Sequence, residues 1–350
     1  KLHQYVDTTK VLLGAHVGGR YADISLGFDE KLGPLIEVVS CWGIFEWLIF
    51  DAFEKQFHIG IMANSDGHKG RPGAEGPGAG EFGIAGGLTC VLAESQTREA
   101  IFTALQNRRC YATTGARIDL NFSINGFSMG EIIQSDDSEI AIKASVKGCT
   151  PLEKIQLING RELLQEQYTP EFAETNSHRL RLAWKGSRMR GRGRRVTWDG
   201  EVRLENCNLI HAQTWSFDSP SDSILEQNNQ SIRFTSHTTG DSDGLDLWLE
   251  DASKGIIHFE TAAGNWKIDL AQLNAKPQRQ DFGGLDMEAW IERYPENPET
   301  FGLIVESTFP APENGYNPYW IKAIQCDGQM AWSSPVYVES DTIQNRRHSE

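Results

Sequence analysis

Residues 11 to 117 alternate between short apolar runs and segments with helical periodicity. Amphipathic patterns of helix length lie at 45–55 and after Thr97, and the apolar runs have the length of strands and cover 11–15, 35–39, 59–63 and 88–92. Short strands that alternate with amphipathic helices are typical of β-α units with a mostly parallel sheet. We therefore predict an α/β fold for this part of the chain.

The pattern changes near Arg117 to alternation with a period of two. Clear examples are 118–124, which ends at an Asn-Gly turn signal, and 140–146. Such half-buried strands separated by polar turns favour an antiparallel β-sandwich-like region, which we expect to cover 118–345. Within it, 275–318 is rich in proline and poor in periodicity, and we expect a long loop excursion there.

A hairpin is expected near the end of this region. It would join 319–325 to 331–338 through Asp327-Gly328, a strong local turn signal. The resulting domain plan is an α/β part at 1–117 followed by an all-β part at 118–345.

The composition excludes several kinds of partner. The 350 residues contain 48 Asp and Glu against 33 Lys and Arg, a formal charge of −15, which repels nucleic acid and anionic membrane surfaces. No apolar run reaches the roughly 18 residues that a membrane span needs. The basic run at 185–195 is expected to pair with nearby acids. We therefore predict neither nucleic acid nor a membrane as a partner.

The heptapeptide NSDGHKG directly follows the apolar run 59–63. In an extended chain Asp66 and His68 project to the same side, so their oxygen and nitrogen can reach one point. Carboxylate and imidazole ligands suit Zn, Mn or Fe, and α/β folds bind ligands at the carboxyl ends of parallel strands. The alternative is a solvated loop with an unrelated Asp and His.

Two further residues fit the same interpretation. His16 directly follows the run 11–15, so a second imidazole lies at the end of a predicted strand. Glu37 is embedded in the apolar sequence LIEVV, where a buried, unpaired carboxylate would cost several kcal/mol and therefore needs a cation or hydrogen-bond donors. Alternatively, Glu37 lies on an edge strand and faces water.

Several segments resemble the C-terminal part of the PHP (polymerase and histidinol phosphatase) family of metal-dependent phosphoesterases. They are HVGGRYAD, EVVSCWGIFEW, ANSDGHKGRPGAEGPG, GGLTCVLAE and TREAIFTALQNRRCYATTGARI. Two later segments, WKGSRMRGRGRRVTWDG and YWIKAIQCDGQMAWSSPVYV, resemble the β-rich region that follows the barrel in large PHP-like proteins. The resemblance implies the C-terminal part of a distorted β/α barrel, followed by the β region.

The resemblance also implies the residues of a site. His16 corresponds to a late metal-binding histidine, and Asp66 with His68 to the closing D-x-H ligand pair. Glu37 is expected to orient a ligand from the second shell. Family members hold up to three divalent metals that activate water for attack on a phosphate ester. Three cations next to these ligands could contact the phosphate, or could be solvated: Arg20, Lys69 and Arg71.

The chain departs from the family pattern at its start. The family opens with an H-x-H pair and further ligands, and none precedes His16 in this sequence. Either an N-terminal half of the barrel is missing or the site is degenerate, and a chain that starts with Lys1 and enters a barrel part-way favours truncation. We therefore expect an incomplete or inactive fragment of the enzyme.

The predicted function is that of a PHP-type metal-dependent hydrolase. It would use Zn, Mn or Fe to activate water against a small-molecule phosphate ester, and an amide or sulfate ester at the same metals is an alternative substrate. A different class of function is a non-catalytic glycan- or protein-binding β domain on a degenerate barrel scaffold. The residues do not predict the compartment or the oligomeric state.

Overall fold

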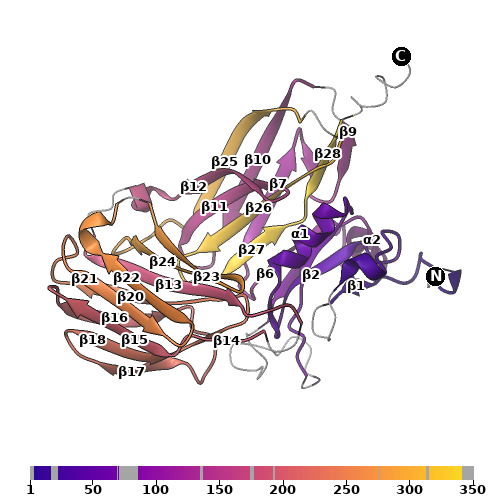
Figure 1. Cartoon of the computed structure of the whole chain (residues 1–350). Coiled ribbons are helices and arrows are strands. Elements are labelled where there is room, and N and C mark those ends of the chain that lie inside the picture. Colours follow the sequence, from indigo (N-terminus) through magenta and orange to yellow (C-terminus); the bar gives the residue numbers. More distant parts are fainter. Residues whose placement is uncertain are drawn as a thin grey trace, which may run out of the picture.

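The computed structural model describes residues 4–16, 23–68, 70, 86–134, 137–173, 177–191, 194–274, 276–312 and 315–340. Within these residues the chain is mostly strand, with two α-helices and the 3₁₀ turns η2 (Ile24–Leu26), η3 (Pro170–Ala173) and η4 (Leu270–Gln272). An α/β region lies at one side of the molecule, next to two layered β regions (Figure 1).

A small sheet forms the centre of the α/β region. It contains β1 (Gly14–Ala15), β2 (Leu35–Ser40), β3 (Gly43–Ile44) and β4 (Gly60–Ala63). The central strand β2 pairs in parallel with β1 on one side and with β4 on the other. The short strand β3 pairs antiparallel with the last two residues of β2. The three predicted strands at 11–15, 35–39 and 59–63 are confirmed, and the carboxyl ends of β1 and β4 lie at the same edge.

Two short helices accompany this sheet. α1 (Glu46–Glu54) buries an apolar face against β2, as its periodicity predicts. α2 (Arg98–Gln106) begins after Thr97, whose hydroxyl accepts a hydrogen bond from the Ala100 amide at 3.2 Å, as expected for a helix cap. Neither helix of the described chain has the length and apolar character needed to cross a bilayer.

The second sheet joins the α/β region to the end of the chain. Its strand order is β12-β11-β26-β27-β6-β5, and β28 pairs with both β26 and β9. The strands are β5 (Leu88–Val91), β6 (Cys110–Thr113), β9 (Ile132–Gln134), β11 (Leu152–Asn159), β12 (Glu162–Tyr168), β26 (Asn317–Gln325), β27 (Met330–Ser333) and β28 (Val336–Glu339). The boundary expected at 117 therefore does not separate two sheets.

Antiparallel pairing dominates this second sheet. We expected β5 as a strand of a mostly parallel sheet, but it pairs antiparallel with β6, and that expectation is wrong. The hairpin at the end of the chain is confirmed, because β26 pairs with β27 and β28. Backbone amides of the α/β region also reach this hairpin: Ile59 donates to the Tyr337 hydroxyl at 2.6 Å and Ile61 to the Ser334 hydroxyl at 2.8 Å.

A third sheet covers the second one and completes the first sandwich. Its order is β25-β10-β7-β8, with strands β7 (Asp119–Ile124), β8 (Phe127–Ser128), β10 (Glu139–Lys147) and β25 (Gly302–Pro310). Alternate residues of β7 and β10 point inward and pack against β11 and β26 in one core. This is the half-buried alternation that the sequence shows.

A second sandwich is inserted between β12 and β25. One sheet has the order β16-β20-β13-β24-β23, the other β17-β18-β15-β21-β22, and a short β14-β19 pair lies at their end. The strands are β13 (Arg179–Ser187), β14 (Val196–Thr197), β15 (Gly200–Glu205), β16 (Leu209–Trp215), β17 (Ser223–Gln227), β18 (Ser231–Thr235), β19 (His237–Thr238), β20 (Ser242–Leu249), β21 (Ile256–Thr261), β22 (Gly264–Asp269), β23 (Gln278–Gly283) and β24 (Leu285–Arg293). Trp184 and Trp198 fill the core between the two sheets.

The fold agrees with the sequence in class but not in every detail. The chain is β-rich with several antiparallel sheets, as predicted. The loop excursion expected at 275–318 is wrong, because β23, β24 and β25 occupy most of it. The described residues show a parallel three-stranded unit in the α/β region and no closed barrel.

Candidate metal-binding site

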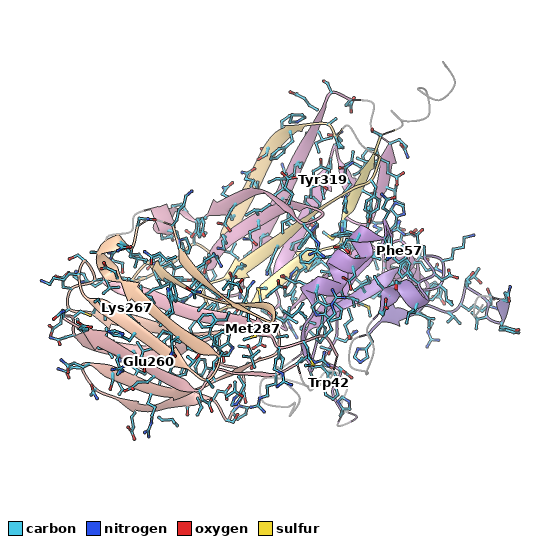
Figure 2. All side chains as sticks on the ribbon, viewed as in Figure 1. Trp42, Phe57, Glu260, Lys267, Met287 and Tyr319 are labelled. Atoms are coloured by element: carbon cyan, nitrogen blue, oxygen red, sulfur yellow. The ribbon has the colours of Figure 1, made fainter. Side chains whose placement is uncertain are left out.

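The carboxyl ends of β1 and β4 bring the predicted residues together. His16 directly follows β1, and Asp66 follows β4 by three residues. Because β1 and β4 flank β2 in parallel, both segments leave the sheet at the same edge. Trp42, just beyond the end of β2, lies at this end of the region, and Phe57, before β4, lies at the other (Figure 2).

The His16 imidazole lies between two carboxylates. Its Nδ1 contacts Oε2 of Glu37, and its Nε2 lies 3.5 Å from Oδ2 of Asp66. A histidine that binds a metal through one ring nitrogen usually gives the other to a carboxylate or a carbonyl. The arrangement therefore leaves Nε2 directed at the position where Asp66 could share a cation with it.

Glu37 is held inside the sheet rather than at its edge. The residue is only 3% exposed, and its Oε1 accepts a hydrogen bond from Nδ2 of Asn64 at 2.7 Å. Burial raises the pKa of Glu37, and the hydrogen bonds from Asn64 and His16 offset only part of this effect. The alternative of a water-facing edge residue is therefore wrong, and the contact fits the predicted orienting role.

Asp66 adopts a backbone conformation that turns the chain sharply after β4. Its φ is +47°, in the left-handed region that non-glycine residues adopt infrequently. Oδ2 is buried and has no hydrogen-bond partner in the described structure, since its 3.5 Å contact with His16 lacks hydrogen-bond geometry. Gly86 packs against this turn, where a Cβ atom would lie 2.6 Å from the Ser65 carbonyl oxygen.

The Cys41 thiol, which the sequence reasoning missed, forms a cluster of possible metal ligands with Asp66 and His68. Cys41, Asp66 and His68 each offer a ligand atom, and these three atoms lie within 4.8 Å of one another. The Cys41 Sγ lies 3.9 Å from Nδ1 of His68 and 3.1 Å from the Asp66 backbone oxygen. Its place directly after the strand that carries Glu37 is the only signal in the sequence.

Burial and the nearby carboxylate keep the Cys41 thiol protonated in the absence of a cation. Desolvation, followed by the negative charge of Asp66, raises its pKa to about 12. A bound cation would reverse this preference, because metals bind the thiolate form of cysteine. A set of thiolate, imidazole and carboxylate ligands matches zinc better than a hard cation such as magnesium.

Aromatic side chains form one wall of the cluster. Trp42 meets the His68 ring edge-on, with ring centroids 5.9 Å apart. The Arg194 guanidinium, from the basic run, lies 5.7 Å from the Trp42 ring and 5.0 Å from the Phe45 ring. The predicted anion contacts Arg20, Lys69 and Arg71 lie outside the described residues.

The comparisons with known proteins match only part of the chain. A family of proteins of unknown function, DUF3604, matches residues 74–152. Uncharacterised proteins of Chlamydia pneumoniae and Chlamydia trachomatis serovar D are 35% and 32% identical over 83 residues. These matches cover 22% of this chain and 13% of each relative, and no solved structure matches the chain. The family match begins after His68, so it includes none of the residues of the cluster.

Proposed function

We propose that this chain contributes ligands to a metal-dependent hydrolase of the PHP type. The observation that supports the proposal most strongly is the placement of His16, which has Glu37 at one ring nitrogen and Asp66 at the other. A surface loop has no need of a buried carboxylate that orients an imidazole toward a second carboxylate. In a metal site each of these contacts has a use.

Four side chains would hold the cation, and a fifth would orient one of them. His16, Asp66 and His68 are the predicted ligands, and Cys41 joins them through its position in the cluster. The unpartnered Oδ2 of Asp66 is the atom that most needs a positive partner. We expect zinc, manganese or iron, and the thiol favours zinc.

The fold proposal is more specific than the β-rich class. We propose that β1, β2, β4 and α1 form the C-terminal part of a distorted β/α barrel, with the β-rich region appended to it. The parallel order of the three strands and the ligands at their carboxyl ends support it. The chain spans only a small part of the relatives it matches, so the activity of a whole protein is also part of this proposal.

The proposed reaction is hydrolysis of a small-molecule phosphate ester. A bound divalent cation lowers the pKa of a water ligand and neutralises charge on the transferring phosphoryl group. The chain's own contribution is to orient His16 through Glu37 and to shield His68 with Trp42. Arg20, Lys69 and Arg71 are proposed to bind phosphate oxygens.

Metal analysis of the protein that contains this chain tests the proposal. His16→Ala and His68→Ala are each expected to reduce bound zinc by at least about tenfold at limiting zinc concentration, since even orienting residues contribute that much. Phosphatase activity, where present, should fall with the metal.

The matched control for these variants is His258→Ala. His258 lies in the second sandwich, where its Nε2 contacts Glu205 at 2.9 Å, so its loss should leave the bound zinc unchanged. Equal metal content and equal phosphatase activity in all four proteins would end the proposal.

A further inference from the structure

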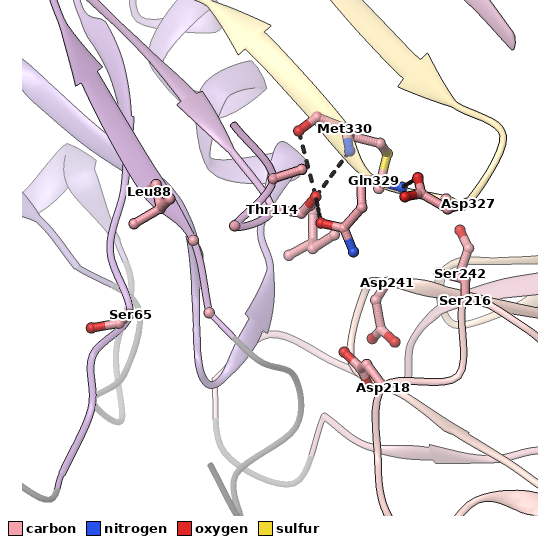
Figure 3. A pocket seen from close by; sticks show the side chains of 16 residues that line it. Ser65, Leu88, Thr114, Ser216, Asp218, Asp241, Ser242, Asp327, Gln329 and Met330 are labelled. Carbon is pink, nitrogen blue, oxygen red and sulfur yellow. Dashed lines mark hydrogen bonds between the residues drawn. The ribbon is translucent and has the colours of Figure 1, made fainter. Parts of the chain in front are cut away.

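A cavity of about 390 Å³ lies where the α/β region meets the second sandwich. Its walls include Leu88 and Thr114 from the α/β side, Met330 from the C-terminal hairpin, and Asp218, Asp241 and Ser242 from the second sandwich. Figure 3 shows that the carboxylates of Asp218 and Asp241 point toward one another. Cavities that bind small molecules start at about 300 Å³, so this one can hold a ligand.

Asp241 lines this cavity and has one carboxylate oxygen without a hydrogen-bond partner among the described residues. The residue is 6% exposed, its Oδ1 accepts hydrogen bonds from the amide and hydroxyl of Thr239, and its Oδ2 is buried with no hydrogen-bond partner in the described structure. A carboxylate oxygen left without a donor or a cation in such a place costs several kcal/mol. The fold therefore retains a group that a ligand could satisfy.

The loop that carries Asp241 is fixed in place by the α/β region. The Thr239 carbonyl oxygen accepts a hydrogen bond from the Ile44 amide at 3.1 Å. Gly43 makes this approach possible, since a Cβ atom there would lie 2.1 Å from the same oxygen. Turning the Asp241 carboxylate away would break its hydrogen bonds from Thr239, the residue that this contact holds in place.

A second buried acidic group, Asp243, lies near the first and supplies no compensating positive charge. Asp243 is 1% exposed, its Oδ2 accepts a hydrogen bond from the Ser236 hydroxyl at 2.6 Å, and its Oδ1 has no partner in the described structure. Burial, together with the charge of Asp241, raises the pKa of Asp243. Among the described residues, no Lys, Arg or His nitrogen lies within 4.0 Å of either carboxylate.

The geometry favours an organic cation over a metal ion. In the described part of the chain, Cys41, Asp66 and His68 are the only three donor side chains whose ligand atoms lie within 4.8 Å of one another. Among these residues the carboxylates at the cavity have no such third His, Cys, Asp or Glu donor, so they offer a small metal ion an incomplete set of ligands. The cavity also has apolar walls at Leu88 and Met330, which suit a carbon skeleton.

We propose that this cavity binds a small organic amine, with its ammonium group against Asp241 and its carbon skeleton against Leu88 and Met330. The Ser242 side of the cavity can accept further polar groups of the ligand. Neither carboxylate belongs to the metal cluster, although the cavity also borders Ser65, which directly precedes Asp66.

Calorimetric titration of the metal-free full chain with matched probes tests the inference. Cyclohexylamine and cyclohexanol have the same skeleton and differ in charge, so the amine is expected to bind at least about tenfold more tightly. Asp241→Asn should weaken binding of the amine by about 10- to 100-fold, the range for a hydrogen bond between charged groups. Asp251→Asn, at a surface turn where Oδ1 of Asp251 accepts a hydrogen bond from the Ser253 amide, should leave it unchanged.

Three results would overturn the inference. Equal affinity for the amine and the alcohol would show that charge plays no part, and this comparison uses only the wild-type protein and needs no folded variant. Unchanged amine binding by Asp241→Asn would place the amine elsewhere. Binding of calcium chloride without binding of cyclohexylamine would show that the carboxylates hold a metal ion after all.

Discussion

Asp246 in the second sandwich and Glu37 in the α/β region are both buried carboxylates, but their partners differ. Asp246 accepts hydrogen bonds from Nη2 of Arg179 at 2.6 Å and from Nε and Nη2 of Arg181 at 2.8 and 2.9 Å. Glu37 has an amide and an imidazole as its partners. One carboxylate is matched by two permanent cations, and the other has none.

The pKa shifts of the two carboxylates differ in sign. Burial alone would raise the pKa of Asp246, but the guanidinium groups of Arg181 and Arg179 outweigh it and hold the pKa below its usual value. Burial raises the pKa of Glu37, and its interactions with Asn64 and His16 do not reverse this shift. A carboxylate with its own cations stabilises the fold, whereas one without them leaves room for a cation from outside.

Removing the matched carboxylate should have the largest effect on stability. Asp246→Ala removes both hydrogen bonds that Arg181, only 1% exposed and buried beside Tyr294, makes to this carboxylate, and leaves it the more distant carboxylate of Glu153 at 3.8 Å, so we expect the free energy of unfolding to fall by about 3–5 kcal/mol. Urea unfolding measures this loss. Arg190→Ala is the control: Arg190 pairs with Asp51 at the surface, so its loss should cost at most about 1 kcal/mol. Similar losses in the two variants would remove the distinction between matched and exposed charges.

Removing the carboxylate of Asp241, which has no cationic partner among the described residues, should raise the free energy of unfolding at neutral and alkaline pH. The pKa of Asp241 is raised to about 6 from 3.8, chiefly by burial, so the folded protein holds this proton more tightly than the unfolded chain. The stability that the protonated Asp241 contributes is fully present below about pH 4, and it is lost as the pH rises through 6. Asp241→Asn should therefore be more stable than the wild type at pH 8, by roughly 2 to 3 kcal/mol, and similar to it near pH 4.

Urea unfolding of both proteins at pH 4, 6 and 8 measures this difference. A variant that is less stable than the wild type at pH 8 would show that Asp241 has a cationic partner in the folded chain. The same variant is expected to bind the amine more weakly. The Asp241 carboxylate would then lower the stability of the fold and support ligand binding.

The smallest effect on stability is expected at Glu37. Glu37→Gln keeps the shape and the acceptor that Asn64 uses, so the free energy of unfolding should change by less than about 1 kcal/mol. Zinc affinity should nevertheless fall by about 10- to 100-fold, because the carboxylate that orients His16 is lost. Competition with a zinc-binding dye measures the affinity, and an unchanged value would mean that Glu37 does not orient a ligand.

The part of the site that the sequence predicts is the part carried by local patterns. His16 and Asp66 each follow an apolar run. Both runs pair in parallel with β2, and this places Nε2 of His16 3.5 Å from Oδ2 of Asp66. Cys41 has no partner cysteine and no spacing motif, so only its place directly after β2 marks it as a candidate ligand. Asp241 and Asp243 look like residues of a polar turn, and only long-range packing buries them.

For the fold as well, the sequence predicted the elements with a clear local pattern and missed those defined by long-range pairing. Strands and helices with a clear apolar face were found, including α2 with its Thr97 cap. β25 was missed because only Val305 of this edge strand is fully buried, and because the exposed Ile304 between Leu303 and Val305 hides the alternation in its sequence. β24 pairs with β13, more than a hundred residues away, and no turn signal connects the two.

The pairing of β6 with β27 determines when the α/β region can finish folding during synthesis. The register joins Thr113 to Ala331, so about 200 residues must leave the ribosome before β6 gains this neighbour. The Ser334 and Tyr337 hydroxyls that receive the β4 amides arrive later still. The segments that carry His16 and Asp66 therefore leave the ribosome well before the strand and the hydroxyls that complete the α/β region, and they lack these partners in the interval.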